Sequence, residues 1–242
     1  MAILNKANLK KFVNHLSKLM QGKSVHFRLA LLIAVVCISL SSLNHANVIN
    51  KVFSQDKLQS LANQYGKQIE PKMRSWQALI EENFDRSDWH RLHEVNHFAH
   101  RNIEYADDII QWQTKDYWAT PVESLAHGKG DCEDYAIFKY MTLRAMGVTE
   151  DKLRLMYVRA ITVDTPHMVL IYFDEPKAIP LVLDNLNPRI LPANRRSDLK
   201  PIYSFNGQGL WLARAHGLGK KVKSGSGVKN WDLLLDRIEL GE

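Results

Sequence analysis

Apolar residues recur at helical spacing through much of the first half of the chain. Leu58 and Leu61 fall on one predicted helix face, and a second run places Met73 and its apolar neighbours on another. The spacing predicts helices from Val48 to about Gln113, interrupted by a turn at Asn83–Ser87. This part of the chain is therefore expected to form a helical lobe.

The period changes in the second half. We expect a loop over Lys115–Lys129, and then a helix from Cys132 to about Met146 that ends at Gly147. Runs rich in β-branched and aromatic residues predict strands at Leu153–Val163, Met168–Phe173, Ile179–Leu183, Ile202–Phe205 and Leu210–Ala213, before a short amphipathic stretch at Trp231–Leu240. Helices followed by a strand meander indicate an α+β fold, with an N-terminal helical lobe and an antiparallel sheet lobe.

The net charge of +6 comes from the first residues of the chain. Residues 1–46 carry six basic residues and no acidic one, so residues 47–242 carry 26 of each sign. The larger segment is thus neutral overall, and a nucleic-acid-binding domain is not indicated.

The basic stretch is followed by an apolar run from Leu29 to Leu43, the arrangement of an export signal. We expect residues 1–46 to be a signal peptide or an N-terminal membrane anchor, and residues 47–242 to be one exported domain in the periplasm. Whether the leader is cleaved stays open, and the positive-inside rule places the domain outside the cytoplasm in both cases. That domain has a single cysteine, Cys132, which cannot form an intramolecular disulfide.

The surroundings of Cys132 indicate a reactive thiol. Two glycines precede it in the segment Gly128–Ala136 (GKGDCEDYA), and the predicted helix begins at or beside the cysteine. A thiol at a helix N-terminus feels the positive end of the helix dipole, which favours the thiolate. A buried and inert cysteine is the competing interpretation.

A thiolate also needs a base that a third group orients. His167 opens a predicted strand, and Asp184 ends the next strand-like run. Two adjacent antiparallel strands would present these side chains near one another. The order Cys132, His167, Asp184 therefore predicts acyl transfer by a thiol.

At this point the chain resembles a known family, the bacterial transglutaminase-like cysteine proteases, and within it the LapG-type periplasmic proteases. The resemblance covers roughly residues 60–240. It is carried by the segments Tyr117–Pro121 with Glu123, Gly130–Ala136 with Lys139, Pro166–Leu170 and Leu183–Asn185.

The resemblance implies a papain-like or transglutaminase-like fold and a triad of Cys132, His167 and Asp184. It implies a calcium requirement that maps onto Asp131 and Glu133. It also implies a large biofilm adhesin as substrate, cut near its N-terminus at a di-alanine site to release it from the cell surface. The implied inhibitor is the periplasmic domain of a membrane cyclic-di-GMP receptor.

The carboxylates beside the thiol have a physical interpretation of their own. Asp131, Glu133 and Asp134 could simply cap the helix and complement its dipole. Three carboxylates around one thiol should, however, disfavour the thiolate by like-charge repulsion. A cation with oxygen ligands would cancel that field. We expect calcium to do so; the sequence does not fix its remaining ligands, for which Asp184–Asn187 are only nearby candidates.

Two alternatives come from other classes of protein. His93-Glu94-Val95-Asn96-His97 spells the HExxH pattern of zinc metallopeptidases, which would place two imidazoles on one helix face with Glu94 as the base. The pattern sits among charged and polar neighbours, and no glycine follows in metzincin register. A non-catalytic periplasmic binding module is the other alternative, and the retained cysteine disfavours it.

Overall fold

The structure is a computed structural model that describes residues 53–213 and 219–241. The expected leader, residues 1–46, lies outside the described residues. Within the described ranges, no helix has both the length and the apolar character that a membrane crossing requires.

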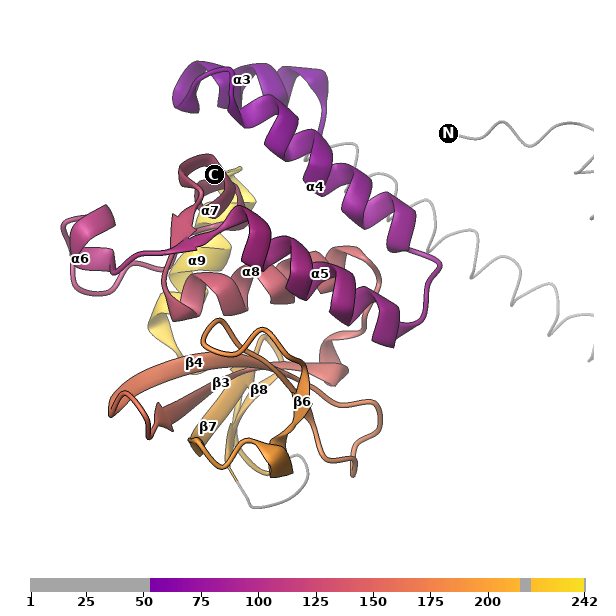
Figure 1. Cartoon of the computed structure of the whole chain (residues 1–242), viewed down its shortest axis with the longest axis vertical. Helices are drawn as coiled ribbons and strands as arrows, with labels where there is room; N and C mark the ends of the chain where they lie inside the picture. Colours follow the sequence, from indigo (N-terminus) through magenta and orange to yellow (C-terminus); the bar gives the residue numbers. More distant parts are fainter. Residues whose placement is uncertain (1–52, 214–218, 242) are drawn as a thin grey trace, which may run out of the picture. The chain divides into compact units, whose positions relative to one another are not determined.

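The described chain begins with three helices, α3 (Gln55–Tyr65), α4 (Ile69–Asn83) and α5 (Asp88–Asn102). The hydroxyls of Ser54 and Ser87 cap α3 and α5 by accepting from backbone N–H groups in the first turn. The predicted helical lobe and its turn at residues 84–87 are confirmed. In Figure 1 these helices lie on the side of the domain opposite the sheet.

The helix predicted to continue to residue 113 ends earlier. After α5 the chain forms a short strand, β1 (Glu104–Tyr105), and then one helical turn, α6 (Asp108–Gln111). β1 pairs in parallel with β2 (Lys129–Gly130), just before the cysteine. This pairing overrides the local helical pattern and brings residues 104–108 beside the start of the cysteine-bearing helix.

The expected loop over 115–129 contains a helix, α7 (Pro121–His127). Its local signals are complete: Thr120 and Glu123 form a capping box, and Pro121 occupies the first turn. Gly128 ends the helix at φ 66°, in the left-handed region. The expectation of a loop was wrong because these capping signals were overlooked.

Helix α8 (Cys132–Ala145) lies at the centre of the domain. It packs on β3 and β4 of the sheet on one side and against α5 and α7 on the other. Most of its residues are buried, including two charged ones that the capping and packing do not explain, Glu133 and Lys139. Cys132 thus stands at the first position of a helix fixed on both sides.

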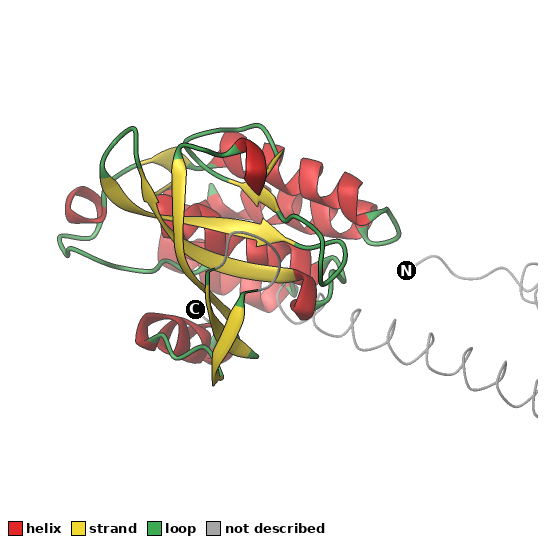
Figure 2. Cartoon of the chain, turned by 90° about the horizontal axis from the view of Figure 1, so that it is seen from below, coloured by secondary structure: helices red, strands yellow, loops and turns green. Residues whose placement is uncertain are grey.

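The sheet has seven antiparallel strands in the order β6-β5-β4-β3-β7-β8-β9. The strands are β3 (Leu153–Ala160), β4 (Thr165–Tyr172), β5 (Leu181–Leu183), β6 (Leu191–Pro192), β7 (Leu199–Asn206), β8 (Gly209–Leu212) and β9 (Lys220–Ser224). A last helix, α9 (Lys229–Leu240), completes the fold. Figure 2 shows the strands crossing the domain with helices behind them. The predicted α+β arrangement is confirmed.

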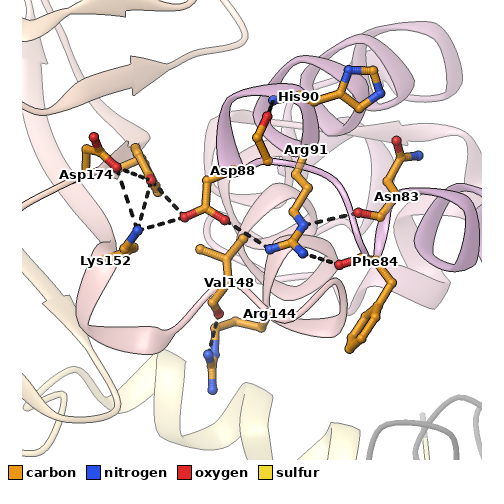
Figure 3. A network of polar contacts seen from close by, with 11 residues as sticks. Asn83, Phe84, Asp88, His90, Arg91, Arg144, Val148, Lys152 and Asp174 are labelled. Atoms are coloured by element: carbon orange, nitrogen blue, oxygen red, sulfur yellow. Dashed lines mark hydrogen bonds and ion pairs between the residues drawn. The ribbon is translucent and has the colours of Figure 1, made fainter. Parts of the chain in front are cut away.

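A polar network fixes the start of α5 against the sheet (Figure 3). Asp88 accepts from Arg91 at 3.0 Å, from Lys152 at 2.8 Å and from the Tyr172 hydroxyl at 2.9 Å. Arg91 also donates to the Asn83 and Phe84 carbonyls. Burial raises the pKa of Asp88, but Lys152, Tyr172 and Arg91 together hold it below its usual value. The network joins helices α4 and α5 to β4.

Candidate active site

Cys132 is the first residue of α8, and its placement depends on a close approach of backbone and helix. A Cβ at Gly130 would come within 2.7 Å of the Asp134 Cβ, so only glycine lets β2 pass so near the helix. The backbone of Met168 on β4 is near enough to the Cys132 sulfur to lower the pKa of the thiol. The thiol lies 3.0 Å from Oε2 of Glu133. The nucleophile predicted from sequence therefore sits where α8 meets β4.

The electrostatics at the thiol oppose its ionisation. Burial raises the pKa of Cys132 well above its usual value, and the charges of Glu133 and Asp131 raise it further. The Met168 N–H acts in the opposite direction and is outweighed. The chain alone thus holds Cys132 as a neutral thiol.

His167 and Asp184 form a buried pair. His167 precedes Met168 on β4, and its Nε2 lies 2.7 Å from Asp184 Oδ1. Both side chains are almost fully buried. Because a carboxylate accepts, Nε2 carries the hydrogen and Nδ1 is left to accept a proton. Asp184 comes directly after β5, which pairs with β4.

Asp184 has partners on both carboxylate oxygens. Oδ1 also accepts from the Leu186 N–H at 3.0 Å, and Oδ2 accepts from Arg196 at 2.5 Å. Burial raises the pKa of Asp184, but His167, Arg196 and Leu186 lower it to about 2. Arg196 is buried and also holds Asp198. Nothing in the local sequence distinguishes Arg196 from the adjacent Arg195, so this contact was not predictable from the sequence.

A second group of carboxylates gathers on the other side of the thiol. Asp131 and Glu133 meet Asp108 at the start of α6 and Asp116 in the following loop, and these four residues are the acidic cluster. Ligand atoms lie within 4.8 Å of one another in three overlapping groups: Asp108, Asp116 and Glu133; Asp108, Asp131 and Asp134; and Asp131, Cys132 and Glu133. Asp184 belongs to none of these groups, and residues Asp184–Asn187 stay predicted candidates for the remaining calcium ligands.

The acidic cluster has the properties of a cation site. Burial and, after it, the adjacent Glu133 together raise the pKa of Asp131 to about 9. Burial raises the pKa of Glu133 to about 7, although hydrogen bonds to Cys132 and Asp131 oppose the shift. Asp108 Oδ1 and Asp131 Oδ1 are buried without a hydrogen-bond partner among the described residues. Carboxylate oxygens without donors suit a hard cation such as calcium.

Neighbouring residues hold the cluster's framework. Asp134 is fully buried and accepts from the backbone N–H groups of Ala119 and Asp131, which satisfies it as a cap. Trp118 is buried and donates its ring N–H to Asp116 at 2.9 Å. From α9, Asn230 donates to the other oxygen of Asp116 at 2.8 Å. Trp118 is thus a core residue that also orients one member of the acidic cluster.

The HExxH segment falls on the outer face of α5. His93 and His97 are exposed, and Glu94 is half-buried. No group of three close metal-ligand side chains within residues 53–213 and 219–241 includes either histidine. Catalytic zinc sites use three protein ligands and an open position, so this helix does not form one from its own residues.

Comparison with known proteins identifies a family that this chain matches. The model of the bacterial transglutaminase-like cysteine proteinase family (BTLCP) matches residues 59–201. Among proteins with curated annotation, none matches this sequence.

Solved structures of LapG from Legionella pneumophila are similar over nearly their whole length. The calcium-bound form has 40% sequence identity to this chain and a TM-score of 0.65. The aligned region covers 76% of this chain and 98% of the Legionella chain. The EGTA-treated form has 40% sequence identity and a TM-score of 0.66, and the aligned region covers 76% of this chain and 96% of the Legionella chain. The family model and the similar structures both cover the segment that carries Cys132, His167 and Asp184. The chain therefore belongs to the bacterial transglutaminase-like cysteine proteases.

Proposed function

We propose that this protein is a calcium-dependent periplasmic cysteine endopeptidase. One observation carries the proposal: Cys132 begins α8, which packs on β4, and the β4 residue His167 has its ring paired at 2.7 Å with buried Asp184. A nucleophile, a base and an orienting carboxylate in this order form the arrangement of triad hydrolases.

Each residue has a role in the proposed reaction. His167 Nδ1 takes the proton of Cys132, and the thiolate attacks a peptide carbonyl. The backbone N–H of Cys132 donates to the oxyanion. His167 then protonates the leaving amine, and water hydrolyses the acyl-enzyme after giving its proton to His167. Asp184 fixes the imidazole tautomer throughout, as the carboxylate does in other triads.

The acidic cluster is the proposed calcium site. Asp108, Asp116, Asp131 and Glu133 would hold the ion, and its charge would offset the carboxylates that raise the pKa of Cys132. Support comes from the two buried oxygens that lack donors and from the calcium-bound and EGTA-treated forms of the Legionella protein.

Substrate, regulation and location rest on the resemblance to LapG-type proteases. We propose cleavage near the N-terminus of a large surface adhesin at a di-alanine site, which releases the adhesin and promotes biofilm dispersal. The proposed inhibitor is the periplasmic domain of a membrane cyclic-di-GMP receptor. The basic and apolar leader of residues 1–46 supports export to the periplasm.

The test is cleavage of an adhesin N-terminal fragment bearing a di-alanine site, with calcium present. The parent protein should cut it, and Cys132→Ala should lose about 10⁶-fold in kcat, as removal of a triad nucleophile does elsewhere. Equal cleavage by both would move the chemistry to the histidines of α5. A folded parent that cuts nothing would contradict the proposed substrate.

A further inference from the structure

Lys139 is a buried lysine that the proposed mechanism does not use. It lies two turns along α8 from Cys132, and its side chain is 0% exposed. Its Nζ donates to the backbone carbonyl of Asp184 at 3.1 Å and lies 5.5 Å from the centre of the Tyr135 ring. Among the described residues, no carboxylate lies within 4.0 Å of this amine. Burying a lysine without a counter-ion is costly, so the position of the amine needs an explanation.

The same carbonyl has a second donor from another helix. His100, near the end of α5, has its Nε2 3.0 Å from the Asp184 carbonyl oxygen, so this nitrogen carries the hydrogen. A carbonyl has two lone pairs, and Lys139 and His100 use both. Helices α5 and α8 thus each supply one donor to the backbone carbonyl of Asp184, directly after β5.

These contacts connect the helix that carries Cys132 to Asp184 and, through Asp184, to His167. Helix α8 carries both Cys132 and Lys139. Lys139 holds the backbone of Asp184, and the Asp184 side chain holds His167 at 2.7 Å. His167 lies on β4, the strand that packs against α8. The contacts of Lys139 and Asp184 therefore hold the base on a strand that itself packs on the helix of the nucleophile.

We propose that Lys139 is a positioning residue for catalysis, fixing Asp184 and through it the His167 ring relative to Cys132. The inference rests on the proposed roles of these three residues. It gives the buried amine of Lys139 a role, since its hydrogen bond goes to the Asp184 carbonyl. The alternative is that Lys139 only fills the core and contributes to stability.

The test compares Lys139→Met with Lys152→Met. Methionine keeps the length of the buried chain and removes the donor. Lys152 is a matched control, because it holds Asp88 and Tyr172 in the network of Figure 3 and does not contact Asp184. Both changes should lower the thermal stability, but only the first should disturb the triad.

We expect Lys139→Met to lower kcat about 10- to 100-fold with little change in KM, since small misplacements of catalytic groups have effects of this size. The alkylation rate of Cys132 by iodoacetamide should fall in parallel, and the low-field proton resonance of His167 Nε2–H should move. Lys152→Met should leave all three readouts unchanged. Lys139→Met with parental kcat, alkylation rate and His167 resonance would overturn the proposal.

Two further variants keep the test decisive. If Lys139→Met does not fold, Lys139→Gln places a shorter polar side chain at the same position, and a folded Lys139→Gln with parental kcat and a parental His167 resonance would overturn the proposal. His167→Ala separates this inference from the proposed function. Alkylation that responds to His167→Ala but not to Lys139→Met contradicts only the positioning role. Alkylation that ignores His167→Ala contradicts the triad itself.

Discussion

Two carboxylate environments flank the thiol, and they differ in what supplies the positive charge. Asp184 is buried, yet its oxygens accept from His167, Leu186 and Arg196, and its pKa falls to about 2. Asp131 and Glu133 are also largely removed from water, yet their pKa values rise to about 9 and about 7. Burial alone therefore does not decide the ionisation of these groups.

The difference lies in the partners that the chain provides. Arg196 brings a guanidinium to Asp184, whereas no lysine, arginine or histidine in the described residues forms an ion pair with Asp131 or Glu133. One half of the site is electrostatically complete in the folded chain. In the proposed function the other half takes its positive charge from bound calcium, and Cys132 belongs to one of its groups of close ligand atoms. This asymmetry would make activity depend on calcium.

The largest expected effect on kcat comes from replacing Asp184, whose charged partner the chain itself supplies. Asp184→Asn should lower kcat by about 10³- to 10⁴-fold, because an amide does not fix the imidazole tautomer or stabilise the imidazolium. Asp198→Asn is the matched control, since Asp198 also contacts Arg196 but not His167. Steady-state kinetics with calcium present measure both. A loss of less than tenfold in Asp184→Asn would remove Asp184 from the triad.

A smaller effect, on calcium affinity, is expected from substitutions in the acidic cluster. Asp131→Asn and Glu133→Gln should each weaken calcium binding by roughly tenfold or more, because affinity follows the charge count of the ligands. Activity should return when calcium is raised. Asp107→Asn removes an exposed carboxylate next in sequence to Asp108 and should leave the calcium affinity unchanged. Isothermal titration calorimetry measures the affinities, and equal affinities in all variants would place calcium elsewhere.

The sequence predicted the complete half of the site better than the other half. Cys132 at a helix start and His167 on a strand follow from local patterns, and the structure has both. Asp108 and Asp116 were missed because their segment was assigned to a continuous helix and a loop. Only the pairing of β1 with β2 brings Asp108 to the thiol, and such long-range pairing leaves no local signal.

The same limit applies to the residues that hold Asp184. Lys139 belonged to the motif, but its sequence position says nothing about the carbonyl that it reaches, and His100 lay in a histidine-rich helix whose pattern favoured zinc. Their shared target becomes visible only when α5, α8 and the end of β5 meet. Helix α7 was different, because its capping box and Gly128 were readable from the sequence and were overlooked.

The most direct test of the account is the pKa of the Cys132 thiol with calcium and with a chelator, measured from the pH dependence of its alkylation rate. Without calcium the thiol should ionise only well above its usual range, because burial, Glu133 and Asp131 oppose the thiolate. With calcium the midpoint should fall, so that thiolate forms at lower pH. The same midpoint in both conditions would contradict the claim that the acidic cluster controls the nucleophile through a bound cation.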